Sequence, residues 1–239
     1  MVTIPAQFNG PLRSGNGGWV CGLLADEWAR RHGADPLGCT VTSRLLQPPP
    51  LDTTLTWEED DEAGELRLLT AGGAVIGTAS PGRFTADPPP VVSRADADAG
   101  AAAYPGYTNH PFDHCFTCGT ARDPGDGLRV FSGPIGDDRT AAPWDVHPAF
   151  GDDNGLIPTP ITWAGLDCPG GWTAGFPQDV ILLGQLTAEV MRAPVPGESL
   201  LATGQLRSRD DRKRLTSTAL YTDDGDLVGR SEQVWIAVG

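Results

Sequence analysis

The sequence predicts an α+β fold in which one unit, a helix followed by an antiparallel meander of strands, occurs twice. Three observations support this. The second half ends in four strand-like runs separated by turn residues, the first half contains four comparable runs, and one helix-like segment precedes each set. Self-similarity of this kind indicates that a structural unit has been repeated within the chain.

The strand predictions rest on runs of β-branched and apolar residues bounded by Gly, Pro and Asp. In the second half the runs are joined by "PVPGE", "DDRK" and "DDG", which are typical of tight chain reversals. We expect strands at 181–193, 199–209, 214–222 and 226–238, and in the first half at 39–47, 52–60, 64–72 and 74–80.

The repeat keeps its register along much of the meander. At a constant offset, Thr42, Pro49 and Leu55 match Thr187, Pro194 and Leu200. At a slightly larger offset, Gly73, Val75, Ile76 and Gly77 match Gly225, Leu227, Val228 and Gly229. We therefore expect the two halves to superpose with these residues in equivalent places.

One helix precedes the meander in each half. Val20, Leu23, Leu24 and Trp28 recur at helical spacing, which predicts a buried helix over 17–32 that ends at Gly33. The second helix is expected over 159–168, because Pro169 fits poorly inside a helix. The Pro-, Ala- and Asp-rich stretch 85–112 has no periodicity and is interpreted as a linker between domains 1–84 and 113–239.

Charge and composition restrict the partners and the compartment. The formal net charge is -14, with 17 Lys and Arg residues, so we expect neither nucleic acid nor an anionic membrane as a partner. The chain has no apolar run of the length needed to span a membrane and no export signal at its start, which favours a cytoplasmic location. Five cysteines at irregular spacing predict reduced thiols.

Two features suggest chemistry. Asp167 lies inside the apolar run "TPITWAGLDCPGGW", where a carboxylate is costly to ionise and needs either a structural partner or a catalytic role. Gly17 and Gly18 begin the first helix, whose free N–H groups could bind a developing oxyanion, with Asn16 beside them. The structural alternatives are a helix-end cap for Asp167 and a simple turn for the glycines.

Three short stretches carry a resemblance to a known family. "GNGGWVCGLLADEW", "TWAGLDCPGG" and "DGDLVGRSEQVWIAV" resemble the Gly-Gly helix start, the Ala-x-x-Asp helix and the final strand with a Gln of the acyl-CoA thioesterase II family. The resemblance implies a tandem, or double, hotdog fold. It also implies a role in lipid metabolism, with acyl-CoA or another acyl thioester as the substrate and no cofactor, and leaves association between copies of the chain open.

The resemblance implies that an Asp, a hydroxyl residue and a Gln hold the water that hydrolyses the thioester. By position the Asp is Asp167 and the Gln is Gln233, whereas Leu183 occupies the expected hydroxyl position. Thr187 on the same strand is the candidate replacement. Because of Leu183, an acyl-CoA or acyl-chain binding protein without hydrolytic activity is the alternative function. A hotdog dehydratase or hydratase is a further alternative, but it would need a His in the site, and the one His within the two predicted helices, His32, is the last residue of the first.

A last motif, "HPFDHCFTCG", offers four potential zinc ligands in Cys115, Cys118, His110 and His114. The spacing matches no standard zinc-binding motif, and both histidines precede the cysteine pair on a short loop that contains a proline. We therefore expect no metal here and interpret the segment as a knuckle that begins the second domain.

Overall fold

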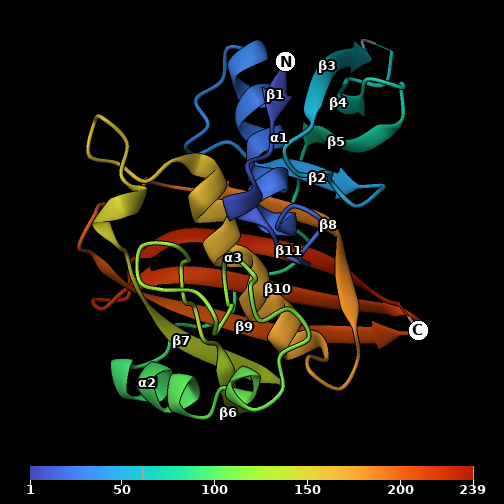
Figure 1. The fold of residues 1–239 in the computed structure, drawn as a ribbon. Helices are drawn as coiled ribbons and strands as arrows, with labels where there is room; N and C mark the ends of the chain where they lie inside the picture. The colour runs from blue at the N-terminus through green and yellow to red at the C-terminus, as the bar shows by residue number, and fades with distance from the viewer. Residues whose placement is uncertain (61, 239) are drawn as a thin grey trace.

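One antiparallel sheet of eleven strands carries two long helices, α1 (Gly17–Arg31) and α3 (Thr159–Ala174), as Figure 1 shows. This is a computed structural model that describes residues 1–60 and 62–238. A third helix, α2 (Arg94–Ala102), packs against the edge of the sheet beside β6 and β7. The class is α+β, as the sequence predicts.

The strands agree closely with the predicted runs. Those of the first half are β1 (Val2–Thr3), β2 (Val41–Leu45), β3 (Thr54–Asp60), β4 (Glu65–Thr70) and β5 (Val75–Pro81). Those of the second half are β6 (Gly133–Gly136), β7 (Arg139–Asp145), β8 (Ile181–Val190), β9 (Ser199–Asp210), β10 (Lys213–Thr222) and β11 (Leu227–Ala237). The sheet order is β1-β3-β4-β5-β2-β8-β11-β10-β9-β7-β6.

The strands follow one another in a corresponding order on the two sides of the centre of the sheet. On one side of the junction between β2 and β8 the strands are β2, β5, β4, β3 and β1, and on the other they are β8, β11, β10, β9 and β7. At the junction itself Thr42 pairs with Thr187, the two residues that the sequence repeat equates.

The turns that close the two meanders are alike in their hydrogen bonds. Gly73 and Gly225 both have positive φ angles, 80° and 91°, which glycine adopts without steric cost. The N–H of Gly73 donates to the carbonyl of Thr70 at 2.9 Å, and that of Gly225 donates to the carbonyl of Thr222 at 3.0 Å. These glycines match at the offset that the sequence predicts.

The two long helices cross at glycines of α1. A methyl group on Gly18 would lie 2.4 Å from Cβ of Asp167 and 2.8 Å from the carbonyl oxygen of Trp163. One turn later, a methyl group on Gly22 would lie 2.7 Å from Cα of Pro160. Only glycine permits this approach, which places the N-terminus of α1 against Asp167.

The prediction that Pro169 ends the second helix is wrong. α3 continues to Ala174, and every residue of 161–174 is buried. Proline has no backbone N–H and so removes one helical hydrogen bond. Burial of the whole turn around Pro169 stabilises the helix despite this loss. Side-chain hydroxyls add to this packing, since the carbonyl of Pro169 accepts from Oγ1 of Thr140 at 3.0 Å and from Oγ1 of Thr173 at 2.7 Å.

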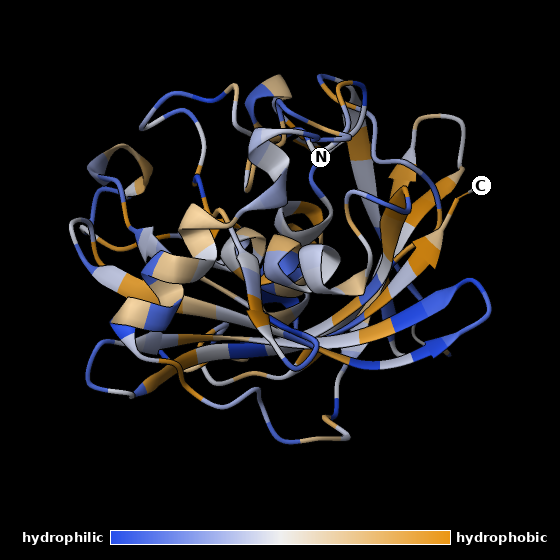
Figure 2. Ribbon diagram, turned by 90° about the horizontal axis from the view of Figure 1, so that it is seen from below, coloured by the Kyte–Doolittle hydropathy of each residue, from blue (hydrophilic) through white to orange (hydrophobic). Residues whose placement is uncertain are grey.

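Other elements were not predicted. The segment 85–112 contains α2, which Ser93 caps by accepting from the N–H of Asp96, and the short strands β1, β6 and β7 were missed. The large helices lie on one side of the sheet (Figure 2), where most buried apolar side chains form one core. Within the described residues no helix has the length and hydrophobicity required to cross a membrane.

Candidate active site

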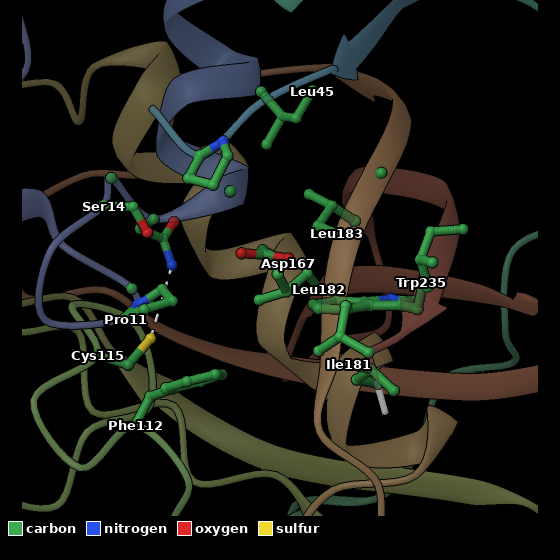
Figure 3. Close-up of a pocket in the computed structure, with 18 of the residues that line it drawn as sticks. Pro11, Ser14, Leu45, Phe112, Cys115, Asp167, Ile181, Leu182, Leu183 and Trp235 are labelled. Atoms are coloured by element: carbon green, nitrogen blue, oxygen red, sulfur yellow. Dashed lines mark hydrogen bonds between the residues drawn. The ribbon is translucent and has the colours of Figure 1, made fainter. Parts of the chain in front are cut away.

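A cavity of about 520 Å³ lies between the N-terminus of α1, the centre of α3, the start of β8 and the end of β11. Apolar side chains line most of it, and Leu46, Val180 and Val238 at its margin are exposed. Figure 3 shows Leu182, Leu183 and Trp235 on one side, Pro11 and Ser14 on the other, and Asp167 between them. The cavity suits an apolar ligand with one polar group.

Asp167 is the one carboxylate among the residues lining this cavity. Its side chain belongs to α3 and is only 2% exposed. One oxygen, Oδ2, accepts a hydrogen bond of 2.9 Å from the N–H of Gly18 at the start of α1. The other oxygen, Oδ1, is buried and has no partner among the described residues, so its capacity to accept a hydrogen bond is unused.

The environment of Asp167 brings the pKa of its carboxyl close to neutral pH. Burial raises the pKa of this carboxyl to about 7, and the hydrogen bond from Gly18 opposes the shift without cancelling it. A carboxyl group with such a pKa can take up and release a proton at physiological pH, as a general base must.

The N-terminus of α1 uses most of its donors internally. The side chain of Asn16 caps the helix by accepting from the N–H of Trp19 at 2.9 Å, and the N–H of Gly18 is occupied by Asp167. Gly17 also lines the cavity, and no hydrogen bond within residues 1–60 and 62–238 engages its N–H. Of the three predicted oxyanion-site residues, Gly17 therefore has the available donor.

Leu183, at the expected hydroxyl position, and Thr187, its candidate replacement, lie in different environments. Leu183 lines the cavity and packs on Gly17, where an added methyl group would lie 2.9 Å from its Cδ2. Thr187 is buried outside the cavity lining, and its Oγ1 lies 2.7 Å from Oγ1 of Thr42. Its hydroxyl is thus paired across the sheet junction, away from Asp167.

Gln233 is buried behind α3 and does not line the cavity. Its Nε2 donates to the carbonyl of Leu166 at 2.7 Å and to Oγ of Ser231 at 3.0 Å. Its Oε1 accepts from Thr216 at 3.0 Å and from the indole of Trp235 at 2.7 Å. The amide is saturated, so this arrangement does not support the predicted water shared with Asp167.

Trp235 was not predicted as a site residue, although it lies two positions from Gln233 on the same strand. It pairs with Leu183 across β8 and β11, and both side chains line the cavity. The alternation of a strand could have identified it, had the register with β8 been known. Apolar side chains therefore flank Asp167 where polar ones were expected.

The cysteine segment lies against the same cavity. Cys115 and Cys118 are buried, and Sγ of Cys115 lies 3.7 Å from Sγ of Cys168 on α3, a residue that the sequence analysis did not select. The two histidines of this segment do not join the group of cysteine sulfurs. His114 is exposed, and His110 accepts from the N–H of Phe112 through Nδ1 at 2.9 Å and contacts the carbonyl of Cys118 through Nε2 at 3.0 Å.

Comparison with solved structures identifies the fold. The chain is similar to acyl-CoA thioesterase II TesB2 from Mycobacterium marinum, with 14% identity, a TM-score of 0.60, and coverage of 94% of this chain and 91% of that one. A protein of unknown function with a hot dog fold from Alicyclobacillus acidocaldarius gives 12% identity, a TM-score of 0.59, and coverage of 99% and 92%.

A third solved structure, a TesB protein from Mycobacterium avium subspecies paratuberculosis, gives 10% identity, a TM-score of 0.59, and coverage of 96% of this chain and 89% of that one. Neither a protein-family model nor a curated protein matches the chain. Identities this low establish shared architecture, so the chain has the hotdog fold.

Proposed function

We propose that the chain is a tandem hotdog protein that hydrolyses an acyl thioester such as acyl-CoA. The observation that carries the proposal is the buried carboxyl of Asp167 at the wall of an apolar cavity, where Oδ1 of Asp167 and the N–H of Gly17 have no hydrogen-bond partner among the described residues. A thioester needs these three things together: a compartment for the acyl chain, a base for water and a donor for the carbonyl oxygen.

The tandem arrangement is supported by repetition at three levels. The strand orders correspond on the two sides of the β2–β8 junction, and the Gly73 and Gly225 turns share their hydrogen bonds. The carbonyls of Pro49 and Pro194, also equated by the sequence, each accept a backbone hydrogen bond of 2.9 Å from the segment before a long helix. We assign the two hotdog units to 1–84 and 113–239, with 85–112 connecting them.

The proposed reaction uses Asp167 as a general base. The ionised carboxylate takes a proton from a water, the resulting hydroxide adds to the thioester carbonyl, and the N–H of Gly17 donates to the oxyanion. Collapse of this intermediate breaks the C–S bond and releases the carboxylic acid, and the departing thiolate takes the proton held by Asp167, which forms the thiol and regenerates the base. The positive end of the α1 dipole favours the negative charge that develops there.

The roles of the other predicted residues are revised. Gln233 and Thr187 have their polar groups paired elsewhere, so we propose that they support the sheet and that Asp167 alone positions the water. Asn16 fixes the helix start that presents the N–H of Gly17.

The test is a screen of CoA esters of different acyl length, followed by comparison of two variants. Asp167→Asn keeps the shape but removes the base, and the rate should fall about 10²- to 10⁴-fold. Asp26→Asn is the matched control, because Asp26 is a partly buried acid on α1 with a pKa also raised by burial, but it does not line the cavity. Release of CoA should be followed by chromatography, since the protein has five thiols of its own.

Equal rates for the parent protein and Asp167→Asn would exclude Asp167 as the base. If no CoA ester is hydrolysed, the alternative is an acyl-CoA or acyl-chain binding protein, which the apolar pair Leu183 and Trp235 beside Asp167 favours. Quenching of tryptophan fluorescence on addition of a non-hydrolysable acyl thioether would then report binding. If the protein neither hydrolyses nor binds these compounds, both functions are excluded.

A further inference from the structure

Three cysteines converge at one wall of the cavity although they come from separate parts of the sequence. Cys115 and Cys118 belong to the loop after α2, and Cys168 belongs to α3. Their Sγ atoms all lie within 4.8 Å of one another, and all three residues line the cavity. We call this group the thiol cluster.

We propose that the thiol cluster binds a thiophilic metal ion, with Zn²⁺ as the expected ion, through three sulfur ligands and with a fourth coordination position toward the cavity. The proposal does not depend on the hydrolytic function. Tetrahedral zinc has Zn–S bonds of about 2.3 Å, which places neighbouring sulfurs about 3.8 Å apart. The 3.7 Å separation of Cys115 and Cys168 fits this spacing closely.

The groups around the cluster suit bound thiolates. Nδ2 of Asn16 lies 3.6 Å from Sγ of Cys115 and donates toward it. The indole N–H of Trp172, a residue only 5% exposed, has no hydrogen-bond partner in the described chain. N–H donors directed at ligand atoms are characteristic of the outer shell of metal sites.

The loop that carries Cys115 and Cys118 is held rigidly against α3. Oγ1 of Thr117 donates to the carbonyl of Ala164 at 3.1 Å, and the hydroxyl of Tyr104 donates to the carbonyl of Cys118 at 2.9 Å. The first of these bonds joins the loop to α3, which carries Cys168, and the second joins it to the segment after α2. Preorganised ligands of this kind favour tight binding.

Charge favours a cation over a disulfide. Three thiols that lose their protons on binding an ion would carry negative charge in one buried region, and none of the residues lining the cavity is a Lys or Arg that could balance it. A metal ion neutralises this charge and uses all three sulfurs. A disulfide would use two and leave the third buried thiol without a role.

The test uses the full chain, reduced and treated with a chelator, and titrated with Co²⁺ under anaerobic conditions. Thiolate-to-cobalt absorption should saturate at one equivalent per chain, and Zn²⁺ should displace it. Cys115→Ala, Cys118→Ala and Cys168→Ala should each weaken binding by more than the 10- to 100-fold that is typical for loss of an outer-shell partner. Trp172→Phe, which removes the indole N–H and one ring of the side chain, should fall within that range.

Cys21→Ala and Cys39→Ala are matched controls, because Cys21 is buried and Cys39 is half-buried outside the cluster. Both should bind Co²⁺ as the parent does. Circular dichroism establishes that each variant is folded. In case a cluster variant does not fold, alkylation of the parent with and without Zn²⁺, read by mass spectrometry, should show protection confined to Cys115, Cys118 and Cys168.

Absence of thiolate-to-cobalt absorption in the reduced parent would overturn the proposal, as would binding that survives all three cluster substitutions. Protection by Zn²⁺ of cysteines outside the cluster would overturn it too. If the protein binds neither Co²⁺ nor Zn²⁺ but forms a disulfide between Cys115 and Cys168, the cluster is a redox pair and not a metal site.

Discussion

The side-chain hydroxyls of Thr42 and Thr187 lie 2.7 Å apart at the centre of the sheet, where β2 pairs with β8. Each residue occupies the same place in its own half of the sequence repeat, so one hydrogen bond joins two equivalent positions. Neither residue lines the cavity. This contact belongs to the junction between the halves, where an unpaired hydroxyl would be costly.

The pair can be tested by a double-mutant cycle. Thr42→Val or Thr187→Val alone leaves one hydroxyl without its partner and should lower the free energy of unfolding by about 1–3 kcal/mol. The double variant should lose less than the sum, with a coupling of about 1 kcal/mol. Urea unfolding measures all three variants. Additive losses would contradict the pairing, and a loss of CoA ester hydrolysis in folded Thr187→Val would return Thr187 to the catalytic site.

The sequence was sufficient to predict much of the sheet because turns and strand alternation are local signals. The four runs predicted in each half coincide with strands to within a few residues, and Gly73 and Gly225, which the repeat equates, both adopt the left-handed conformation in their turns. The helix end at Pro169 was predicted wrongly, since burial on all sides of α3 outweighs the local preference of proline.

The site was harder to predict because its chemistry depends on contacts between distant segments. The apolar surroundings of Asp167 are visible in the sequence, and the structure places it in the cavity. The saturated amide of Gln233 depends on the packing of β11 against α3, which no local pattern records. Cys168 lies some fifty residues from Cys115, so only the fold could join it to the thiol cluster.

The helix crossing gives a second prediction through two adjacent glycines. Gly18→Ala should destabilise the protein by 3 kcal/mol or more, above the usual cost of about 1–3 kcal/mol for overpacking, because its methyl group would meet the backbone oxygen of Trp163 at 2.8 Å. Gly17→Ala should cost less, since it meets only the side chain of Leu183. Thermal and urea unfolding compare the two. A larger loss for Gly17→Ala would contradict the crossing described here.

A third prediction separates a structural Gln233 from a catalytic one. Gln233→Ala removes five hydrogen bonds, including those to Leu166, Ser231 and Trp235, and should lower the free energy of unfolding by about 2–4 kcal/mol. The folded variant should retain the parental rate of CoA ester hydrolysis within a few-fold at low temperature. A large fall in rate without a loss of stability would show that Gln233 acts on the substrate or its water.

The fourth prediction concerns stability and pH. Burial raises the pKa of Asp167 from its usual value near 4 to about 7 in the folded protein. The folded state therefore holds its proton more tightly than the unfolded state does. The stabilisation from this protonated carboxyl is complete below pH 4 and is lost as the pH rises through 7, a change of about 4 kcal/mol.

Asp167→Asn cannot ionise, so its free energy of unfolding should lack this component of the pH dependence. Relative to the parent, the variant should become more stable as the pH rises from 4 to 8, with most of the change complete by about pH 7. Urea unfolding of both proteins at intervals across this range, with a chelator present to keep the thiol cluster free of metal, measures the difference. Asp26→Asn, a half-buried acid on α1, should show a smaller change. If the difference in free energy of unfolding between the parent and Asp167→Asn stayed constant from pH 4 to 8, Asp167 would be ionised throughout this range. Its pKa would then not lie near neutral pH, and the argument that it acts as a base there would fail.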